Sequence, residues 1–317
     1  MEQVLTNVNA GTGSLFSVSA IRTALLLSLG YFFLSLMIVG YHSDQVVLVV
    51  IFNTLYFSSH VTRKFILSFS IFIIYWIIFD YMKALPNYEV NSVHIGSLYN
   101  LEKSWFGIQT AGGVLTPNEL FAQHPQHLLD ILSGIFYLCW VPVPLLFASY
   151  LYFRNKDLFF RFALSFLWVN IIGFVGYYLF PAAPPWYISQ QGFDFISTTP
   201  GNTAGLARFD AITGWNVFHS IYSKSSNVFA AMPSLHASYM LIVVIYAFKK
   251  QMKYWKYLFV ILMLGIWFSA VYTSHHYVLD VLAGIGVGLL GVATLEAFAR
   301  SSFGKLFLSS LNYHIHK

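Results

Sequence analysis

Long, continuously apolar runs follow one another along most of this chain, separated by short polar segments. Runs of this length predict helices that cross a membrane, whereas barrel strands would alternate apolar and polar residues. The runs lie at 22–40, 45–59, 65–82, 127–152, 159–180, 232–248, 256–273 and 276–298, and the second is short for a span. The pattern therefore predicts an all-α, polytopic membrane bundle of about eight transmembrane helices.

Two long polar loops, 83–126 and 181–231, interrupt the apolar runs. The first contains Thr116, Pro117, Asn118 and Glu119 in succession. Thr as N-cap, Pro at the first helical position and Glu two residues further on are typical of a capping box. We expect a short interfacial helix there that leads into the 127–152 span, with either a mechanical or a substrate-binding role.

Composition agrees with a membrane protein, because 57% of the 317 residues are hydrophobic and 9% are charged, against about 25% charged in soluble domains. The net charge of +5 is divided among short loops rather than gathered on one face, which argues against nucleic acid as a partner. The lone Cys139 excludes a disulfide within the chain. The first run lacks a cleavage site, so it is expected to be an uncleaved signal-anchor.

The distribution of basic residues predicts the orientation of the bundle. With eight spans, thirteen of the seventeen Lys and Arg residues fall on the side that holds both termini. Only Lys83, Lys103, Arg208 and Lys224 fall on the other side. The positive-inside rule then places both termini in the cytoplasm. Loop 181–231 and the turn near residue 275 would face the periplasm, the cell exterior or an organelle lumen.

The first string of chemical interest is Pro-Ser-Leu-His at 233–236. Proline is preferred in the first turn of a helix, so His236 is expected near free backbone N–H groups and the positive end of the helix dipole. A histidine there can donate a proton to an oxyanion leaving group. It can also be a simple helix-start histidine at the membrane interface.

The second string is Ser-His-His at 274–276, followed by Asp280. Ser274 can cap the last span, and the spacing of His276 and Asp280 puts both on one helical face. A carboxylate that accepts from one ring nitrogen fixes the tautomer and raises the basicity of the other nitrogen. An intramembrane carboxylate is costly and so indicates function, although the pair can also simply lock helices together.

A metal site is a further interpretation of the same residues, with His275, His276, Asp280 and His236 as ligands. Adjacent histidines point to different helix faces and no second His follows at i+4, so we expect no metal. Further along, Gly284 and Gly288, with Gly286 and Gly291 nearby, predict close packing of the last span against its neighbours.

Together these strings resemble motifs of the type-2 phosphatidic acid phosphatase superfamily, and specifically its inositol phosphorylceramide synthase branch. The resemblance covers about 125–297 and is carried by four segments in order, at 182–187, 205–210, 232–236 and 269–280. It implies a core of six helices with the site at one membrane face. It also implies that His276 attacks phosphorus to form a phosphohistidine, that Asp280 orients His276, and that His236 is the general acid and base.

This chain departs from the superfamily pattern at three places. The first motif, K-x6-R-P, is absent, Leu235 replaces a glycine in the second, and Ala270 replaces an arginine in the third. The remaining cationic candidates near the site are Arg208, Lys224 and His275. A phosphomonoester carries about −1.5 to −2 charges and a phosphodiester carries one. A depleted set of cations therefore favours a diester donor over a lipid monophosphate.

Loop 181–231 is the expected binding region. Trp186 and Tyr187 suit the lipid–water interface. Arg208 and Asp210 are candidates for contacts with the donor phosphate and the inositol hydroxyls, unless they pair with each other. Ser234 and Asp130 are further binding candidates, and Asp130 can alternatively cap its helix.

The sequence therefore predicts a phosphotransferase that moves phosphoinositol from phosphatidylinositol to a ceramide-like hydroxyl and releases diacylglycerol, without a cofactor or metal. A lipid phosphate phosphatase that uses water, and a non-enzymatic transporter or scaffold, stay as alternatives. We expect N-terminal helices and an interfacial loop over 1–120, a catalytic core over 121–300 and a cytoplasmic tail over 301–317. The sequence leaves a regulatory subunit open.

Overall fold

The computed structural model describes residues 14–223 and 227–316, and these are helical almost throughout. They form two compact units, one made of 14–84 with 302–316 and the other of 85–301. The all-α expectation is confirmed. The exception within the described residues is a small antiparallel hairpin in which β1 (Ile108–Thr110) pairs with β2 (Gly113–Leu115). The domain boundaries expected at 120 and 300 stay predictions.

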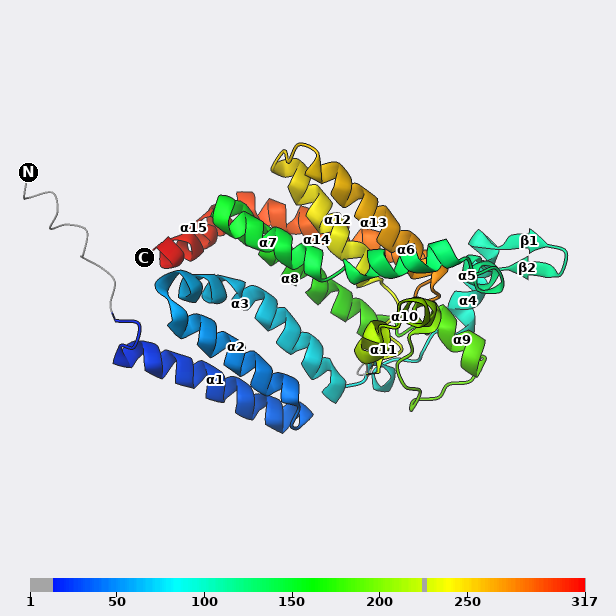
Figure 1. Cartoon of the computed structure of the whole chain (residues 1–317), viewed down its shortest axis with the longest axis horizontal. Coiled ribbons are helices and arrows are strands. Elements are labelled where there is room, and N and C mark those ends of the chain that lie inside the picture. Colours follow the sequence, from blue (N-terminus) through cyan, green and yellow to red (C-terminus); the bar gives the residue numbers. More distant parts are fainter. Residues whose placement is uncertain (1–13, 224–226, 317) are drawn as a thin grey trace, which may run out of the picture. The chain divides into compact units, whose positions relative to one another are not determined.

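The first unit holds three long helices that lie side by side (Figure 1). Two side-chain contacts join them, Ser35 hydroxyl to Tyr81 hydroxyl at 2.8 Å and Asn53 Nδ2 to Ser28 Oγ at 2.7 Å. The elements are α1 (Val18–Val39), α2 (Ser43–Ser58), α3 (His60–Tyr81), the 3-10 turn η1 (Met82–Ala84) and the C-terminal α15 (Ser302–His316).

The second unit combines five long helices with short helices that connect them. The long ones are α7 (Pro142–Arg154), α8 (Lys156–Leu179), α12 (Leu235–Lys249), α13 (Trp255–Tyr272) and α14 (Val278–Arg300). The others are η2 (Asn87–Glu89), α4 (Gly96–Phe106), α5 (Pro117–Gln123), α6 (His127–Leu138), α9 (Pro185–Gln191), η3 (Ala204–Leu206), α10 (Ala207–Thr213) and α11 (Val217–Tyr222).

Among the described residues, six helical segments are long and apolar enough to cross a membrane, and α2 and α12 are shorter apolar helices. This agrees with an integral membrane protein of about eight spans. The expected span at 127–152 is one of the six, as His127–Arg154, and it contains a turn where α6 ends at Leu138 and α7 begins at Pro142. Pro142 and Pro144 start the new helix, and the residue before a proline disfavours helical geometry.

Helix α12 lies at the centre of the second unit and is buried on nearly every side between α8, α13 and α14. The predicted close packing of glycines is confirmed. A Cβ at Gly284 would clash with the Ser234 carbonyl oxygen, and one at Gly291 would clash with the Val169 side chain. Gly288 faces Leu241, whereas Gly286 faces open space. The bare backbone of α14 therefore lies directly against α12 and α8.

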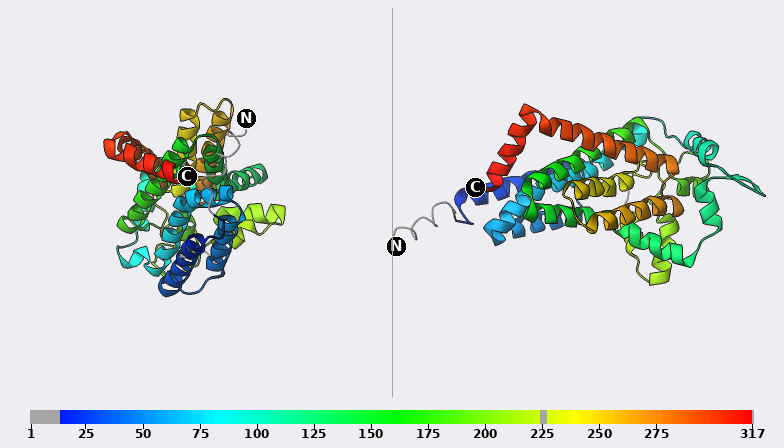
Figure 2. Two further views of the ribbon diagram at one scale, coloured as in Figure 1. Left: turned by 90° about the vertical axis from the view of Figure 1, so that its left-hand side faces the viewer. Right: turned by 90° about the horizontal axis from the view of Figure 1, so that it is seen from above.

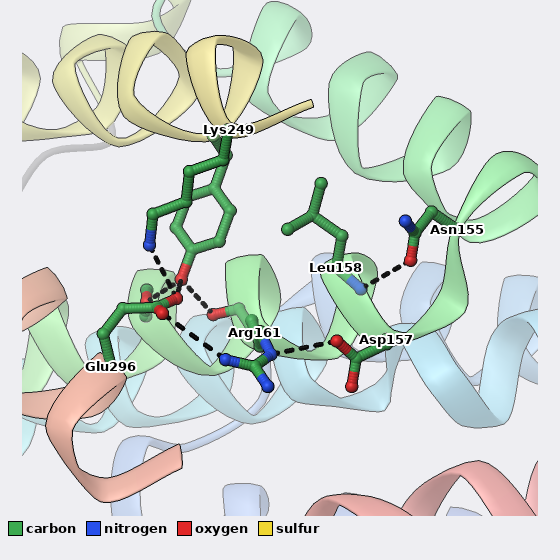
Figure 3. Close-up of polar contacts among 8 residues, drawn as sticks. Asn155, Asp157, Leu158, Arg161, Lys249 and Glu296 are labelled. Atoms are coloured by element: carbon green, nitrogen blue, oxygen red, sulfur yellow. Dashed lines mark hydrogen bonds and ion pairs between the residues drawn. The ribbon is translucent and has the colours of Figure 1, made fainter. Parts of the chain in front are cut away.

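A polar network joins α8, α12 and α14 at one end of the second unit (Figure 3). Glu296 accepts from Lys249 at 2.8 Å and from Tyr246 hydroxyl at 2.7 Å, and it pairs with Arg161 at 3.4 Å. Arg161 also pairs with Asp157 at 3.0 Å. These contacts compensate the charges and hold the three helices together at that end.

The other end of these helices carries the connecting segments. Helices α4, α5, α9, α10 and α11 gather there, and the β1–β2 hairpin projects beyond them (Figures 1 and 2). The predicted capping box of α5 is confirmed, since Thr116 Oγ1 accepts from the Glu119 amide and Glu119 accepts from the Thr116 amide at 2.8 Å. The starts of α12 and α14 lie at the same end, where the Ser234 amide donates to the Asp280 carbonyl at 2.9 Å.

Candidate active site

The start of α12 positions His236. The helix begins at Leu235, so Pro233 directly precedes the N-cap Ser234. His236 still lies in the first turn. Its ring packs edge-on against Trp140 at a centroid distance of 4.5 Å and near Tyr137 at 5.1 Å. These rings form an apolar wall on one side of the histidine.

A tight turn between α13 and α14 positions His276. The amides of His275 and His276 both donate to the Ala270 carbonyl, at 3.1 and 3.0 Å, and Ser274 has a positive φ of 60°. The expectation that Ser274 caps the last span is wrong, because the N-cap of α14 is Tyr277. His276 therefore lies just before the helix rather than within it, and the turn fixes the backbone from which its ring extends.

The ring of His276 contacts three partners. Its Nδ1 donates to the Ala231 carbonyl at 3.0 Å and lies 3.5 Å from Asp280 Oδ2, and its Nε2 lies 3.0 Å from His236 Nδ1. Two acceptors at Nδ1 keep the proton there and leave a lone pair on Nε2. The three residues expected to be catalytic are thus brought together, and His276 presents a nucleophilic nitrogen towards His236.

Asp280 is completely buried. Its Oδ2 accepts from the Tyr277 amide at 2.8 Å, so the carboxylate also closes the first turn of α14. The shorter contact of His276 Nδ1 is with Ala231, not with Asp280. The carbonyl therefore shares the orienting role that the sequence assigned to the carboxylate alone.

We expect Asp280→Ala to lower turnover by about 10²–10⁴-fold, the range seen when the third member of such a triad is lost. The loss should stay below that of His276→Ala, since Ala231 continues to hold Nδ1. The measurement is the rate of product formation by the purified variant, after its thermal stability has been checked. Asp280→Asn is a control that keeps the size of the side chain. Turnover at the wild-type rate in Asp280→Ala would show that the carboxylate has no orienting role.

Arg208 lies beside the site but is paired with Asp130. Its Nε donates to Asp130 Oδ1 at 2.6 Å, and Tyr272 hydroxyl donates to the same oxygen at 2.9 Å. The Nη2 of Arg208 is buried and has no hydrogen-bond partner among the described residues. Asp130 thus orients the guanidinium, and one of its nitrogens stays available for an anion.

Asp210 has a structural environment instead of the expected place in a binding site. Its two oxygens accept from the amides of Phe218 and His219, at 3.2 and 2.8 Å, and so cap α11. Asp210 does not pair with Arg208, which bonds to Asp130 instead. It is also buried, with an exposure of 6%. The expectation that Asp210 contacts inositol hydroxyls has no support in this geometry.

His275 is enclosed by two tyrosine rings. It stacks on Tyr222 at 4.5 Å and on Tyr137 at 5.4 Å, and its Nε2 donates to the Thr203 carbonyl at 3.0 Å. Burial lowers the pKa of His275 to about 3, with His276 adding to the shift. The ring is therefore neutral, and His275 fastens loop 181–231 to the catalytic turn rather than supplying the positive charge we expected.

The remaining binding candidates have different positions. Trp186 and Tyr187 are buried against Phe229 and Ile95, which contradicts the expected location at the lipid–water interface. Ser234 is fully buried, and its hydroxyl has no hydrogen-bond partner within the described part of the chain. Lys224 lies outside the described residues. Within those residues, no cluster of three or more His, Cys, Asp and Glu is arranged to hold a metal.

Sequence reasoning missed two polar residues close to the site. Glu102 of α4 accepts from the amides of Val278 and Leu279, at 3.0 and 3.1 Å. Asn118 of α5 donates to the carbonyls of Val271 and His276. The local sequence gives no signal for Glu102, because it lies among the polar residues Asn100, Lys103 and Ser104.

Comparison with known proteins finds relatives that are named as synthases of inositol-containing sphingolipids. The phosphoinositol dihydroceramide synthase of Bacteroides thetaiotaomicron is 49% identical over 255 residues, 80% of this chain and 84% of the relative. The catalytic subunit AUR1 of inositol phosphorylceramide synthase from Saccharomyces cerevisiae is 36% identical over 121 residues, 37% of this chain and 29% of its own. The corresponding subunit of Schizosaccharomyces pombe is 25% identical over 72% of this chain and 53% of its own.

No solved structure matches the chain significantly. The family model of the PAP2 superfamily matches residues 97–294, a range that includes His236, His276 and Asp280. It also includes α4 and α5, which the expected catalytic core from residue 121 left out. This match and the relative that is 49% identical place the chain in a known family: it belongs to the PAP2 superfamily.

Proposed function

We propose that this protein transfers phosphoinositol from phosphatidylinositol to the hydroxyl of a ceramide-type lipid, through a phosphohistidine at His276. The observation that carries the proposal is the 3.0 Å contact of His276 Nε2 with His236, while Nδ1 of the same ring is held by Ala231 and Asp280. The ring of His276 is oriented through Nδ1, and an acid–base partner contacts its nucleophilic Nε2. This arrangement suits double displacement at phosphorus.

In the first step, His276 Nε2 attacks the phosphorus of the donor and the bond to the glycerol oxygen breaks. His236, as imidazolium, protonates that oxygen, so that neutral diacylglycerol leaves. The phosphorylated ring keeps its proton on Nδ1 and carries a positive charge. Asp280 and the Ala231 carbonyl stabilise that charge, because both face Nδ1.

In the second step, the hydroxyl of the acceptor lipid loses its proton to neutral His236 and attacks the same phosphorus. The bond between phosphorus and His276 Nε2 breaks, and the new diester carries the phosphoinositol. His236 is an imidazolium again and His276 has recovered its lone pair. Acid and base exchange roles on one residue, so no further proton carrier is required.

The contact of the two histidines has to open when the donor binds. A phosphoryl group does not fit between two nitrogens that are 3.0 Å apart. The donor phosphate therefore displaces the ring of His236 from His276 and takes its place next to Nε2. His236 then faces the leaving oxygen instead of the nucleophile.

Two further facts support a phosphodiester donor. Among the described residues at the site, Arg208 is the cation found there, and Asp130 already offsets its charge. One partly compensated cation suits the single negative charge of a diester. The relatives are also named as synthases of phosphoinositol dihydroceramide and inositol phosphorylceramide, which indicates the head group and the class of acceptor.

We also propose that both termini are cytoplasmic and that the site faces the opposite side of the membrane. The network of Arg161, Lys249 and Glu296 lies at the other end of the helices from the histidines. Arg154, Lys156, Lys250 and Arg300 are at the ends of helices on that same side. An excess of basic residues is typical of the cytoplasmic side.

The test is to incubate purified protein with phosphatidylinositol labelled in the inositol, together with dihydroceramide, diacylglycerol or no acceptor, and to identify the products. We expect a labelled phosphoinositol ceramide-type lipid and stoichiometric diacylglycerol. Rapid release of inorganic phosphate from lipid monophosphates, without transfer from phosphatidylinositol, would instead identify a phosphatase.

A further inference from the structure

Three buried polar side chains from residues 85–118 reach across to the backbone that carries the catalytic groups. They are Asn87, Glu102 and Asn118, each at most 2% exposed. None belongs to the three residues that perform the proposed reaction. Each bonds to main-chain atoms of a distant segment, at sequence separations from 90 to 177 residues. These three side chains therefore support the backbone around the site and not the reacting groups themselves.

Glu102 makes the closest connection to the nucleophile's partner. Its two oxygens accept from the amides of Val278 and Leu279, the two residues directly before Asp280. Asp280 itself accepts from the Tyr277 amide. Two carboxylates thus satisfy three successive amides of the first turn of α14, which is a charge-assisted and rigid arrangement.

Asn118 and Asn87 fix the backbone on the two sides of the His276 ring. Asn118 Nδ2 donates to the His276 carbonyl at 2.9 Å and to the Val271 carbonyl at 2.8 Å. Asn87 Nδ2 donates to the Phe229 carbonyl at 2.9 Å, two residues before Ala231, whose carbonyl holds His276 Nδ1. Both the residue that carries the ring and the segment that orients it are therefore held.

The free-energy cost of burying the Glu102 carboxylate argues that this residue has a role beyond stability. Burial raises the pKa of Glu102, and nearby Asp280 raises it further. A carboxyl with a raised pKa in the folded state adds stability only below its unfolded pKa, and that contribution disappears as the pH rises through the folded value. The ionised carboxylate is therefore unfavourable for folding, yet it offers an accepting oxygen to each of the two amides, whereas a glutamine amide would offer one oxygen only.

We infer that Glu102 is a positioning residue for the phosphotransfer: it holds the first turn of α14 so that Asp280 and His276 keep the geometry in which Nε2 meets phosphorus. Asn118 supports the same turn from the opposite side. The inference rests on the proposed function, since it concerns the rate at which His276 becomes phosphorylated. Glu102 is fully buried and does not contact the substrate.

The experiment is single-turnover formation of the phosphohistidine from labelled phosphatidylinositol, with the rate constant expressed per site that can be labelled. Glu102→Gln should lower this rate constant by about 10–100-fold, because displacements of about 1 Å near a reacting group have effects of that size. KM should stay unchanged. Glu102→Asp, which keeps the charge on a shorter side chain, should fall between Gln and wild type and replaces Glu102→Gln if that variant does not fold.

Glu296→Gln is the matched control, because it changes a partly buried carboxylate on α14, the helix that carries Asp280. Glu296 is sixteen residues from Asp280 and so about 24 Å away along the helix. We expect lower thermal stability with an unchanged rate constant per labelled site. In an Asp280→Ala background, Glu102→Gln should cause little further loss, since both act through one turn.

A wild-type rate constant in Glu102→Gln would overturn the inference, as would losses that simply multiply with Asp280→Ala. An equal loss of the rate constant in the control Glu296→Gln would also overturn it, since the effect would then come from a general loss of stability. Absence of a labelled histidine in the wild-type protein would contradict the proposed function instead, so that the two failures are distinguishable.

Discussion

His276→Ala is expected to remove phosphoinositol transfer almost completely, by at least about 10⁴-fold, the scale found when a catalytic nucleophile is deleted. The reason is chemical. Nε2 of His276 is the nitrogen with a free lone pair at the centre of the site, while its Nδ1 is occupied by Ala231 and Asp280. No covalent intermediate can then form at this position. The measurement is transfer of labelled head group to a ceramide-type acceptor by purified protein.

His276→Gln controls for the loss of packing, because the imidazole is 5% exposed and alanine leaves a gap beside His236 and Ala231. Glutamine refills much of that volume but offers no nucleophilic nitrogen. Both variants should bind donor lipid and unfold near the wild-type temperature. Transfer above about 1% of wild type in a folded variant would exclude His276 as the nucleophile.

His236→Ala is expected to lower turnover by about 10²–10⁴-fold, the usual contribution of a general acid or base. His236 Nδ1 lies 3.0 Å from the nucleophilic nitrogen, and once the donor phosphate has displaced it from that nitrogen it can protonate the leaving oxygen. A donor whose leaving group is a weakly basic phenol requires no such proton. With that donor, phosphohistidine formation should recover in His236→Ala but not in His276→Ala.

The matched control is Trp140→Phe, which alters the wall beside His236 and keeps the histidine. We expect it to change the rate by less than about 10-fold. Equal losses for natural and phenolic donors in His236→Ala would contradict the role in proton transfer and indicate that the residue only packs.

The amino-acid pattern already groups the three candidate catalytic residues, because two of them are close in the chain and the third lies at a helix start. His236 is in the first turn of α12, and Asp280 follows His276 by four residues at the start of α14. The apolar runs predict the spans for a similar reason, since bilayer thickness sets their length. The break between α6 and α7 follows from Pro142 and Pro144, which are visible in the sequence.

The candidate binding residues have other environments in the structure, and for Trp186 and His275 the partners are distant in the chain. Asp210 caps α11, Trp186 is buried against Phe229, and His275 is enclosed by Tyr137 and Tyr222. Residue type alone suggested an anion contact or an interface position for each. Whether a charge or a ring faces substrate depends on packing between segments that no local pattern encodes.

Glu102 and Asn118 are a second case in which the contacts of a residue could not be predicted from the sequence. Their loop offered a capping box, which the structure confirms, but no sign that its polar side chains reach α14 and the catalytic turn. Contacts over 176 and 158 residues become visible only when the helices are placed together. Residues of this kind hold catalytic groups without touching substrate.

The most direct test of the account is to trap and identify the covalent intermediate. Wild-type protein is mixed briefly with phosphatidylinositol in the absence of acceptor, quenched under alkaline conditions that preserve phosphohistidine, and digested for mass spectrometry. We expect an adduct of phosphoinositol mass on His276, which dihydroceramide then removes as a phosphoinositol lipid at the rate of turnover. An adduct on another residue, a bare phosphoryl group on His276, or full transfer without any adduct would contradict it.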